Sequence, residues 1–265
     1  MLFPRMDAIM NNGRSLFLAY DQGLEHGPRD FTVKNADPEY ILNIALEGKY
    51  DGIILQHGVA EKYYHGPYKE IPLIVKLNGK SSLTHLSPFS TQLCSVERAI
   101  KLGAKAVGYT IYDGSDMESE MFKQFTKIVE KAHEFGIPVI AWMYPRGKEI
   151  KKDTTTDVLA YSARIGLELG ADIVKLKYNN DPEGFKWVTH NAGRTKVVIA
   201  GGDKQPDEDF LKMIEQAMKT GVLGVAVGRN IWQSKNPFAL SKALREIVHN
   251  GKTFEEVKHL LDKED

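Results

Sequence analysis

The chain has 265 residues, enough for one large domain with a sizeable hydrophobic core. Its 35 lysine and arginine residues balance 35 aspartate and glutamate residues, and a formal net charge of zero excludes nucleic acid and an anionic membrane surface as main partners. The single Cys94 excludes an internal disulfide. No apolar run approaches the roughly 20 residues of a membrane span, and residues 1–12 lack the apolar stretch of a secretory signal. We therefore expect a cytoplasmic protein.

Short runs of β-branched and other apolar residues recur along the chain and predict eight strands. Most of these runs are apolar throughout rather than alternating, which is typical of strands that are covered on both faces of a parallel sheet. The predicted strands are Ser15–Tyr20, Asp51–Gln56, Leu73–Leu77, Ala106–Thr110, Val139–Tyr144, Ile173–Tyr178, Val197–Ala200 and Gly224–Val227.

Helical patterns lie between most of these strands, and glycines such as Gly103, Gly136 and Gly170 end a helix before the next strand begins. The predicted helices are Pro38–Leu46, Ser95–Leu102, Met117–Phe135, Thr155–Leu169, Pro182–Asn191, Asp207–Thr220, Pro237–Val248 and a terminal Phe254–Lys263. An open parallel sheet is one outcome of this order. Eight strand–helix units in about this length favour a closed, single-domain (β/α)8 TIM barrel over residues 1–265, with its active site at the C-terminal strand ends.

The run GADIVKLKY, from Gly170 to Tyr178, places two lysines inside an apolar strand. Side chains alternate along a strand, so Lys175 and Lys177 share the face of Ile173 and their amines are expected to point into a core. Burial and like-charge repulsion both lower the pKa of a lysine, and a neutral amine can form a Schiff base with a carbonyl. The alternative is that one or both pair with a carboxylate or reach outward, and physical reasoning does not choose between them.

Polar residues close several other predicted strands, where a barrel would place its active site. They include Asp21 after the first strand, Lys76 in the third, and Trp142, Tyr144 and Arg146 at the fifth. Buried tyrosines and tryptophans are most often packing residues, and that remains the alternative for them.

The last two strands are followed by glycines and a cation. Gly201 and Gly202 follow the seventh strand, and Gly228 and Arg229 follow the eighth. Exposed backbone amides and a guanidinium at adjacent strand ends are typical of a phosphate site in a barrel, although tight turns alone would also explain the glycines.

Other catalytic signatures are missing from the sequence. His26, His57, His65 and His85 show no metal-ligand spacing, and neither a nucleophile elbow nor a dinucleotide or P-loop motif occurs. We therefore expect no metal and no cofactor.

An ordered series of motifs resembles the archaeal-type class I fructose-1,6-bisphosphate aldolases of the DeoC/FbaB (DhnA-like) group. The motifs are AYDQGLEHGP (19–28), GVAEKYYHG (58–66), VKLNGK (75–80), GYTIYDGS (108–115), WMYPRG (142–147), KLKY (175–178) and AVGRNIWQ (226–233). The resemblance covers nearly the whole chain. It implies a (β/α)8 barrel that cleaves fructose 1,6-bisphosphate reversibly without a metal, and a homo-oligomer, often of ten subunits.

The resemblance also implies a role for individual residues. Lys175 would be the Schiff-base lysine and Lys177 its electrostatic neighbour, Tyr144 the general acid/base, Trp142 a lining residue and Asp21 a catalytic carboxylate, while Gly201, Gly202, Gly228 and Arg229 would contact phosphate. Two positions depart from the family pattern: Gln22 replaces a usual histidine, and Ala200 a common serine.

Two rival functions remain on the sequence alone. The same imine chemistry could act on another substrate, as in the related amino-dideoxy-heptulosonate synthases or deoxyribose-phosphate aldolases. A barrel that only binds phosphorylated metabolites would need no lysine, tyrosine and aspartate together at its strand ends.

Overall fold

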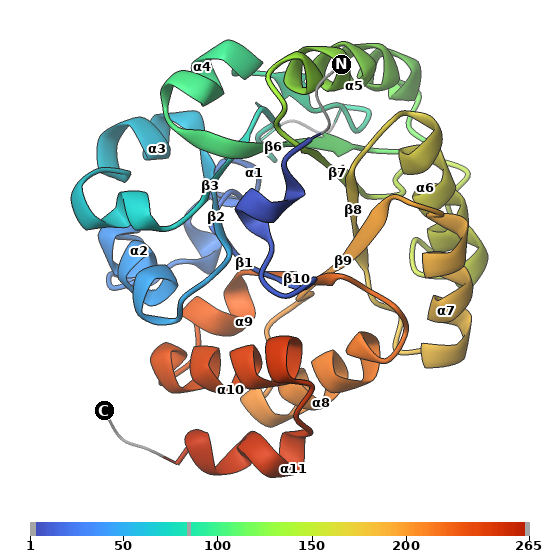
Figure 1. Ribbon diagram of the computed structural model, residues 1–265. Coiled ribbons are helices and arrows are strands. Elements are labelled where there is room, and N and C mark those ends of the chain that lie inside the picture. Colours follow the sequence, from blue (N-terminus) through green and yellow to red (C-terminus); the bar gives the residue numbers. More distant parts are fainter. Residues whose placement is uncertain (1–3, 84–85, 263–265) are drawn as a thin grey trace.

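Eight parallel strands close into a barrel in the computed structural model, which describes residues 4–83 and 86–262 (Figure 1). The order around the barrel is β1-β10-β9-β8-β7-β6-β3-β2, and β1 closes the ring with Leu16 opposite Val225 of β10. The strands are β1 (Ser15–Ala19), β2 (Gly52–Gln56), β3 (Leu73–Lys76), β6 (Ala104–Ile111), β7 (Val139–Met143), β8 (Ile173–Lys177), β9 (Lys196–Ala200) and β10 (Gly224–Val227). The predicted TIM barrel and its eight strands are confirmed.

The barrel strands are apolar on both faces because one face fills the barrel and the other lies under the helices. Inward-facing side chains form a separate core cluster, which includes Phe17, Ile54, Ile74, Ile140, Ile173 and Val198. Their neighbours along the chain, such as Leu16 and Leu18, pack in the outer core. Because Ile173 faces inward, Lys175 does too.

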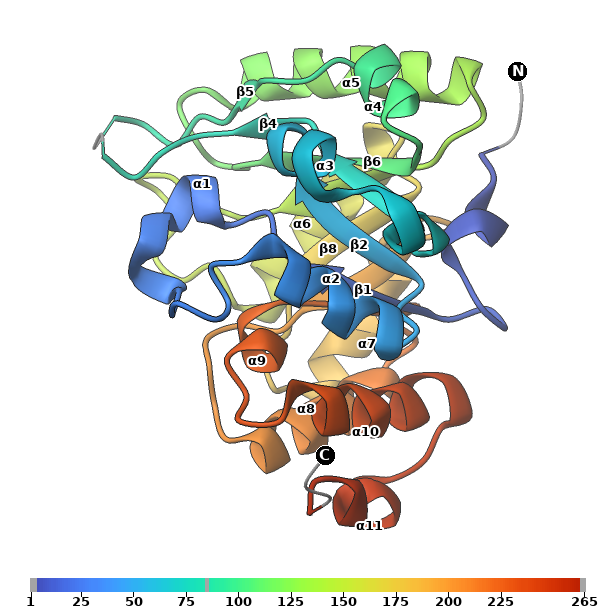
Figure 2. The ribbon, with the colours of Figure 1, turned by 90° about the vertical axis from the view of Figure 1, so that its left-hand side faces the viewer.

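The N-terminal segment closes one end of the barrel. The 3-10 helix η1 (Met6–Ile9) places Ile9, 1% exposed, in the inner cluster, and Ser15 Oγ donates a hydrogen bond to its carbonyl at 2.9 Å. In Figure 1 this segment (dark blue) lies over the centre of the barrel, and in Figure 2 it lies on the side opposite α1 (Gly23–His26). The C-terminal strand ends are therefore the end at which a cavity can form.

Helices surround the barrel. The longer ones are α2 (Pro38–Glu47), α3 (His57–Tyr63), α4 (Val96–Lys101), α5 (Glu118–Glu134), α6 (Thr156–Glu168), α7 (Pro182–Asn191), α8 (Asp207–Met218) and α10 (Pro237–Asn250). Ser95 and Thr155 cap α4 and α6 through their hydroxyls. Gly136 and Gly170 adopt φ of +68° and +87° after α5 and α6, so the predicted glycine stops are confirmed.

One helix was missed and one predicted helix is shorter than expected. Helix α3 was not predicted, because Ala60 is its one buried residue and it has no apolar stripe. The predicted terminal helix Phe254–Lys263 is shorter: α11 (Phe254–Val257) is followed by the 3-10 helix η4 (Lys258–Leu260), and Lys263 lies outside the described residues.

The remaining elements are short. They are α9 (Arg229–Trp232), the 3-10 helices η2 (Gly27–Asp30) and η3 (Gly66–Glu70), and a two-stranded sheet of β4 (Asn78–Gly79) and β5 (Thr91–Gln92) beside the C-terminal strand ends. Of the helices in residues 4–83 and 86–262, none combines the length and the apolar character that crossing a bilayer requires.

Candidate active site

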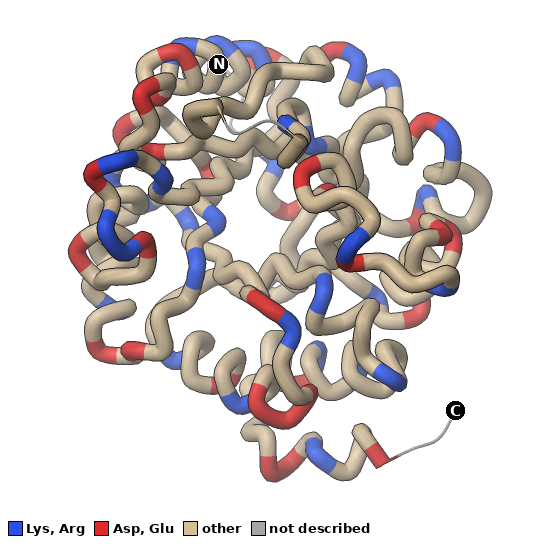
Figure 3. The backbone as a smooth tube through the Cα atoms, turned by 180° about the vertical axis from the view of Figure 1, so that it is seen from behind, with Lys and Arg blue, Asp and Glu red and all other residues tan. Residues whose placement is uncertain are grey.

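A cavity of about 520 Å³ lies at the C-terminal ends of the barrel strands. Figure 3 shows the molecule from this side, with lysine and arginine positions (blue) around the centre of the barrel. All nine residues predicted for the site line this cavity: Asp21, Trp142, Tyr144, Lys175, Lys177, Gly201, Gly202, Gly228 and Arg229. The barrel thus brings together residues that are up to about 200 positions apart in the chain.

Lys175 extends from β8 into the cavity. Its side chain is buried, with 5% of the residue exposed, and its Nζ lies 5.1 Å from the centre of the Trp142 ring on the neighbouring β7. Burial lowers the pKa of Lys175 to about 8, and the positive charge of Lys76 acts in the same direction, while Asp21 opposes it. At pH 7 about a tenth of such amines are neutral, against about 0.0004 for an ordinary lysine.

Lys177 does not share the buried environment that was predicted for both lysines. Its side chain is 39% exposed, and its Nζ forms an ion pair with Asp153 at 2.5 Å in the loop between β7 and α6. The expectation that both lysines point into the core is therefore correct for Lys175 alone. Lys177 lines the cavity at its rim, and the cation that lowers the pKa of Lys175 is Lys76 instead.

Lys76 was predicted only as one of the polar residues that close the strands, and no role was assigned to it. It is the last residue of β3, it is 5% exposed, and its Nζ lies 3.5 Å from Asp21 Oδ2 just after β1. The signal that identified Lys175, a lysine at the end of an apolar strand, applies to Lys76 as well.

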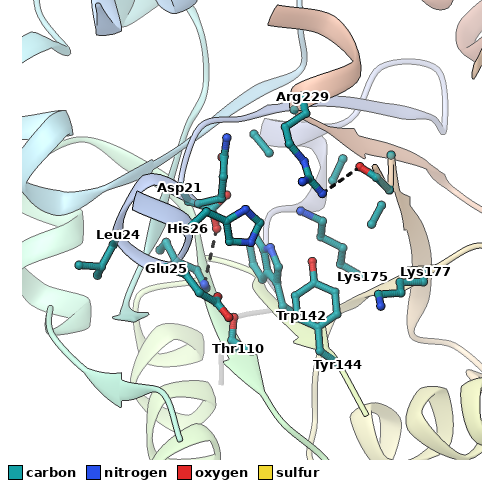
Figure 4. Close-up of a pocket in the computed structure, with 18 of the residues that line it drawn as sticks. Asp21, Leu24, Glu25, His26, Thr110, Trp142, Tyr144, Lys175, Lys177 and Arg229 are labelled. Atoms are coloured by element: carbon teal, nitrogen blue, oxygen red, sulfur yellow. Dashed lines mark hydrogen bonds and ion pairs between the residues drawn. The ribbon is translucent and has the colours of Figure 1, made fainter. Parts of the chain in front are cut away.

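Tyr144 follows β7 and shares the space of Lys175. Figure 4 shows the Tyr144 ring, the Lys175 side chain and the Arg229 guanidinium directed toward one another. Burial raises the pKa of the Tyr144 phenol, and the carboxylates of Asp21 and Glu25 add to the effect. Tyr144 therefore keeps its proton at physiological pH and can donate a hydrogen bond in the cavity.

Glu25 and Arg146 form a second charged group in the cavity. Glu25 Oε1 accepts hydrogen bonds from Tyr112 Oη at 2.7 Å and from Arg146 Nη1 at 2.9 Å. Burial by itself would raise the pKa of Glu25, but Tyr112, Arg146 and Lys76 together hold it below its usual value. The motifs around these residues were noted in the sequence, but no site role was predicted for Glu25 or Arg146.

The glycine loops after β9 and β10 are tied together. Asn230, fully buried, donates from Nδ2 to the Gly201 carbonyl at 2.8 Å. A Cβ at Gly228 would lie 2.7 Å from the Ala19 carbonyl oxygen, so the backbone approaches β1 closely there. Arg229 Nη2 lies 2.8 Å from Asp203 Oδ1, whose side chain is 95% exposed and free to turn away.

Two buried side-chain N–H donors on the cavity wall have no hydrogen-bond partner within the described part of the chain. They are Nε2 of Gln22, the position that departs from the family pattern, and Nε1 of Trp142. Because an unsatisfied buried donor costs about 1–3 kcal/mol, a bound molecule with acceptor oxygens would relieve that cost.

Histidines do not gather in this cavity. Across residues 4–83 and 86–262, no group of three or more histidine, cysteine, aspartate or glutamate side chains is placed to hold a metal ion. His26 Nδ1 lies 2.7 Å from Asp30 Oδ2, and His85 lies outside the described residues.

Comparisons with known proteins agree with this geometry. A family model described as DeoC/LacD family aldolase matches residues 15–234. The class 1 fructose-bisphosphate aldolase of Thermoproteus tenax is 48% identical over 247 residues, which cover 92% of this chain and 93% of that protein. A Methanocaldococcus jannaschii protein named fructose-bisphosphate aldolase/6-deoxy-5-ketofructose 1-phosphate synthase is 38% identical over 269 residues, covering 95% of this chain and 86% of its own.

One solved structure is similar to this chain over most of its length. It is an archaeal fructose-1,6-bisphosphate aldolase with its catalytic lysine covalently bound to the carbinolamine intermediate of the substrate. It matches this chain with a TM-score of 0.87 at 47% identity, over 91% of this chain and 96% of that one.

Proposed function

This chain belongs to the DeoC/LacD family of aldolases, and we propose that it is a class I fructose-1,6-bisphosphate aldolase, which forms dihydroxyacetone phosphate and glyceraldehyde 3-phosphate reversibly. The observation that carries the proposal is the buried Lys175 amine, with its pKa near 8, in one cavity with Tyr144, Asp21 and the glycine loops. The names of the relatives support the choice of substrate.

Lys175 is the nucleophile in this proposal. Its neutral Nζ attacks C2 of the open-chain ketose, the carbonyl π electrons move to oxygen, and the carbinolamine then loses water to give a protonated imine. The C3–C4 bond breaks as its electron pair moves toward the imine nitrogen. The C4 hydroxyl loses its proton, the aldehyde leaves, and the enamine is protonated at C3 before hydrolysis releases dihydroxyacetone phosphate.

Tyr144 and Asp21 share the proton transfers. Asp21, whose Oδ2 lies 3.5 Å from Lys76 Nζ, supplies the carboxylate that accepts a proton, and Tyr144 supplies the protonated phenol that donates one. Positioned acids and bases of this kind contribute about 10² to 10⁴ in rate.

The phosphate groups bind by backbone and guanidinium contacts. Gly201, Gly202 and Gly228 line the cavity, and Arg229 can exchange Asp203 for phosphate. Binding energy gathered at the phosphates positions the reacting carbons over Lys175 and Trp142.

Borohydride trapping tests the nucleophile. Reduction in the presence of fructose 1,6-bisphosphate should leave one covalent adduct that peptide mapping places on Lys175, and Lys175→Ala should lose both adduct and turnover. Lys177→Met is the matched control, because it removes the rim lysine and should still form the adduct on Lys175. An adduct on another lysine, or full activity in Lys175→Ala, would overturn the proposal.

A panel of phosphorylated sugars tests the substrate. Turnover of fructose 1,6-bisphosphate should exceed that of deoxyribose 5-phosphate and of 1-phosphorylated deoxyketoses. Preference for one of those would keep the imine chemistry and change the assigned substrate, while tight binding without turnover or adduct would indicate a binding protein.

We also propose that the protein acts in the cytoplasm as a homo-oligomer, as the family resemblance implies. The exposed aromatic side chains of Tyr161 on α6 and Trp187 on α7, 70% and 53% exposed, support contacts between subunits. Sedimentation velocity tests the assembly, and the resemblance favours a decamer.

A further inference from the structure

Two buried lysines, rather than one, lie beside the ring of Trp142. Nζ of Lys175 is 5.1 Å from the ring centre and Nζ of Lys76 is 5.2 Å from it. Each lysine is 5% exposed, and each ends or nearly ends a barrel strand, β8 and β3. The cavity therefore holds two amines in one desolvated place, although only one is needed to form an imine.

Asp21 is shared unequally between these two amines. Its Oδ2 lies 3.5 Å from Lys76 Nζ, and both side chains are less than a tenth exposed. Among the described residues no carboxylate lies within ion-pair distance of Lys175 Nζ. Asp21 therefore forms an ion pair with Lys76 and none with Lys175.

The other groups around the pair fit this division. Glu25, from α1, also interacts with the charge of Lys76. Trp142 and Tyr144, from the end of β7, present an indole and a protonated phenol. Lys177, on β8 itself, is turned to Asp153. Asp21 and Glu25 thus both interact with the charge of Lys76, whereas Asp21 is the carboxylate that opposes the lowered pKa of Lys175.

We propose that Lys76 is a positioning residue of this site: its ammonium pairs with Asp21 and repels a proton from Lys175, which raises the uncharged fraction of the nucleophile. Burial contributes most to the lowered pKa of Lys175 and Asp21 opposes it, while Lys76 lowers the pKa further, which supports this role. The arrangement follows the general rule that an adjacent cation activates a Schiff-base lysine. The inference rests on the proposed imine chemistry, and it assigns to Lys76 the electrostatic part that the sequence assigned to Lys177.

The test is the pH dependence of covalent trapping. The protein is incubated with dihydroxyacetone phosphate and cyanoborohydride between about pH 6 and about pH 10, a range that brackets a perturbed lysine, and intact-mass spectrometry follows the adduct. In the unmodified protein the rate should rise with a midpoint near the Lys175 pKa of about 8. In Lys76→Met, which removes the charge and keeps the length, the midpoint should rise by about one pH unit, and trapping at pH 7 should fall about tenfold.

Two further variants separate charge from shape. Lys76→Arg keeps a cation beside Asp21, so its midpoint should remain close to that of the unmodified protein. Lys177→Met removes a lysine two residues from Lys175, and its midpoint should not move. An unchanged midpoint in Lys76→Met, or an equal rise in Lys177→Met, would overturn the inference.

A second background covers the case in which Lys76→Met does not fold because Asp21 is left buried without a partner. With Asp21→Asn the carboxylate is gone, and adding Lys76→Met should raise the midpoint relative to Asp21→Asn alone. No rise in that pair would also reject the role of Lys76. Absence of any adduct in the unmodified protein would reject the proposed imine chemistry instead, so the two failures are distinguishable.

Discussion

Gly108 on β6 leaves the space that the ring of Trp142 fills: a Cβ at position 108 would lie only 2.0 Å from Cζ3 of the indole. The ring is fully buried and lies beside the amines of Lys175 and Lys76. The missing side chain at Gly108 therefore determines where the wall of the cavity stands relative to the nucleophile.

We expect Gly108→Ala to reduce kcat/KM by about tenfold or more and to destabilise the fold by about 1–3 kcal/mol, because the ring must shift and the interior is overpacked. Steady-state kinetics and urea unfolding measure the two effects. Gly58→Ala on α3 is the control, since a Cβ there meets nothing within 4 Å and alanine favours helix. Normal activity in Gly108→Ala would show that the site tolerates a displaced indole.

Removing the nucleophile should stabilise the protein. Since the folded-state pKa of Lys175 is about 8 and the ordinary value is 10.5, the unfolded state binds more protons between those pH values, and stability rises with pH through that window. Below pH 8 the buried ammonium lowers the free energy of unfolding by up to about 3 kcal/mol. Lys175→Met should therefore gain about 1–3 kcal/mol at pH 7, and the gain should shrink toward zero near pH 10.5.

Urea unfolding at pH 7 and near pH 10 measures this gain. Lys177→Met serves as the comparison, because its amine is 39% exposed and paired with Asp153, and its stability should change by less than about 0.5 kcal/mol at either pH. A loss of stability in Lys175→Met at pH 7 would mean that the amine has a stabilising partner in the folded protein.

Asp203 should compete with substrate phosphate for Arg229. Its Oδ1 lies 2.8 Å from Arg229 Nη2, but the side chain is 95% exposed, and ion pairs this exposed contribute about 0–1 kcal/mol to stability. Asp203→Asn should therefore lower KM for fructose 1,6-bisphosphate by up to about fivefold with little change in kcat. Asp209→Asn, an exposed aspartate on α8, controls for the change in net charge. A higher KM in Asp203→Asn would show that the carboxylate positions the guanidinium.

The barrel could be predicted because its signals are local. Each strand is an apolar run whose two faces are both buried, and caps and glycine stops mark the helices between them. Helix α3 carries no such signal, since Ala60 is its only buried residue. Lys175 could be predicted because a lysine in a run of buried residues breaks the pattern.

The charge pairs could not be predicted in the same way. Alternation puts Lys175 and Lys177 on one face, but Lys177 is the last residue of β8 and reaches Asp153, which a loop places at the rim. Lys76 and Asp21 come from β3 and the end of β1, which are separated by β2 in the barrel. Which lysine pairs with Asp21 depends on the direction of side chains that come from different strands, and the periodicity of the sequence does not predict that direction.

Asp113, just after β6, is a buried carboxyl outside the cavity whose charge should destabilise the fold. Its Oδ2 accepts a hydrogen bond from Ser162 Oγ on α6, and its Oδ1 has no partner among the described residues. Burial raises its pKa to about 6 from 3.8, although the bond from Ser162 opposes this. Between these pH values the folded state binds more protons than the unfolded state, so stability should fall as pH rises from about 4 to about 6.

Asp113→Asn removes the charge and should therefore stabilise the protein by about 1–2 kcal/mol at pH 7 and have little effect near pH 4. Urea unfolding at both pH values measures the difference. The same substitution at the exposed Asp116, which pairs with Lys148 at 3.4 Å, should change stability by less than about 0.5 kcal/mol at either pH. If Asp113→Asn is instead less stable at pH 7, the carboxylate must be stabilised in the folded state by more than the Ser162 hydroxyl, and its ionised form would then help to hold α6 against the end of β6.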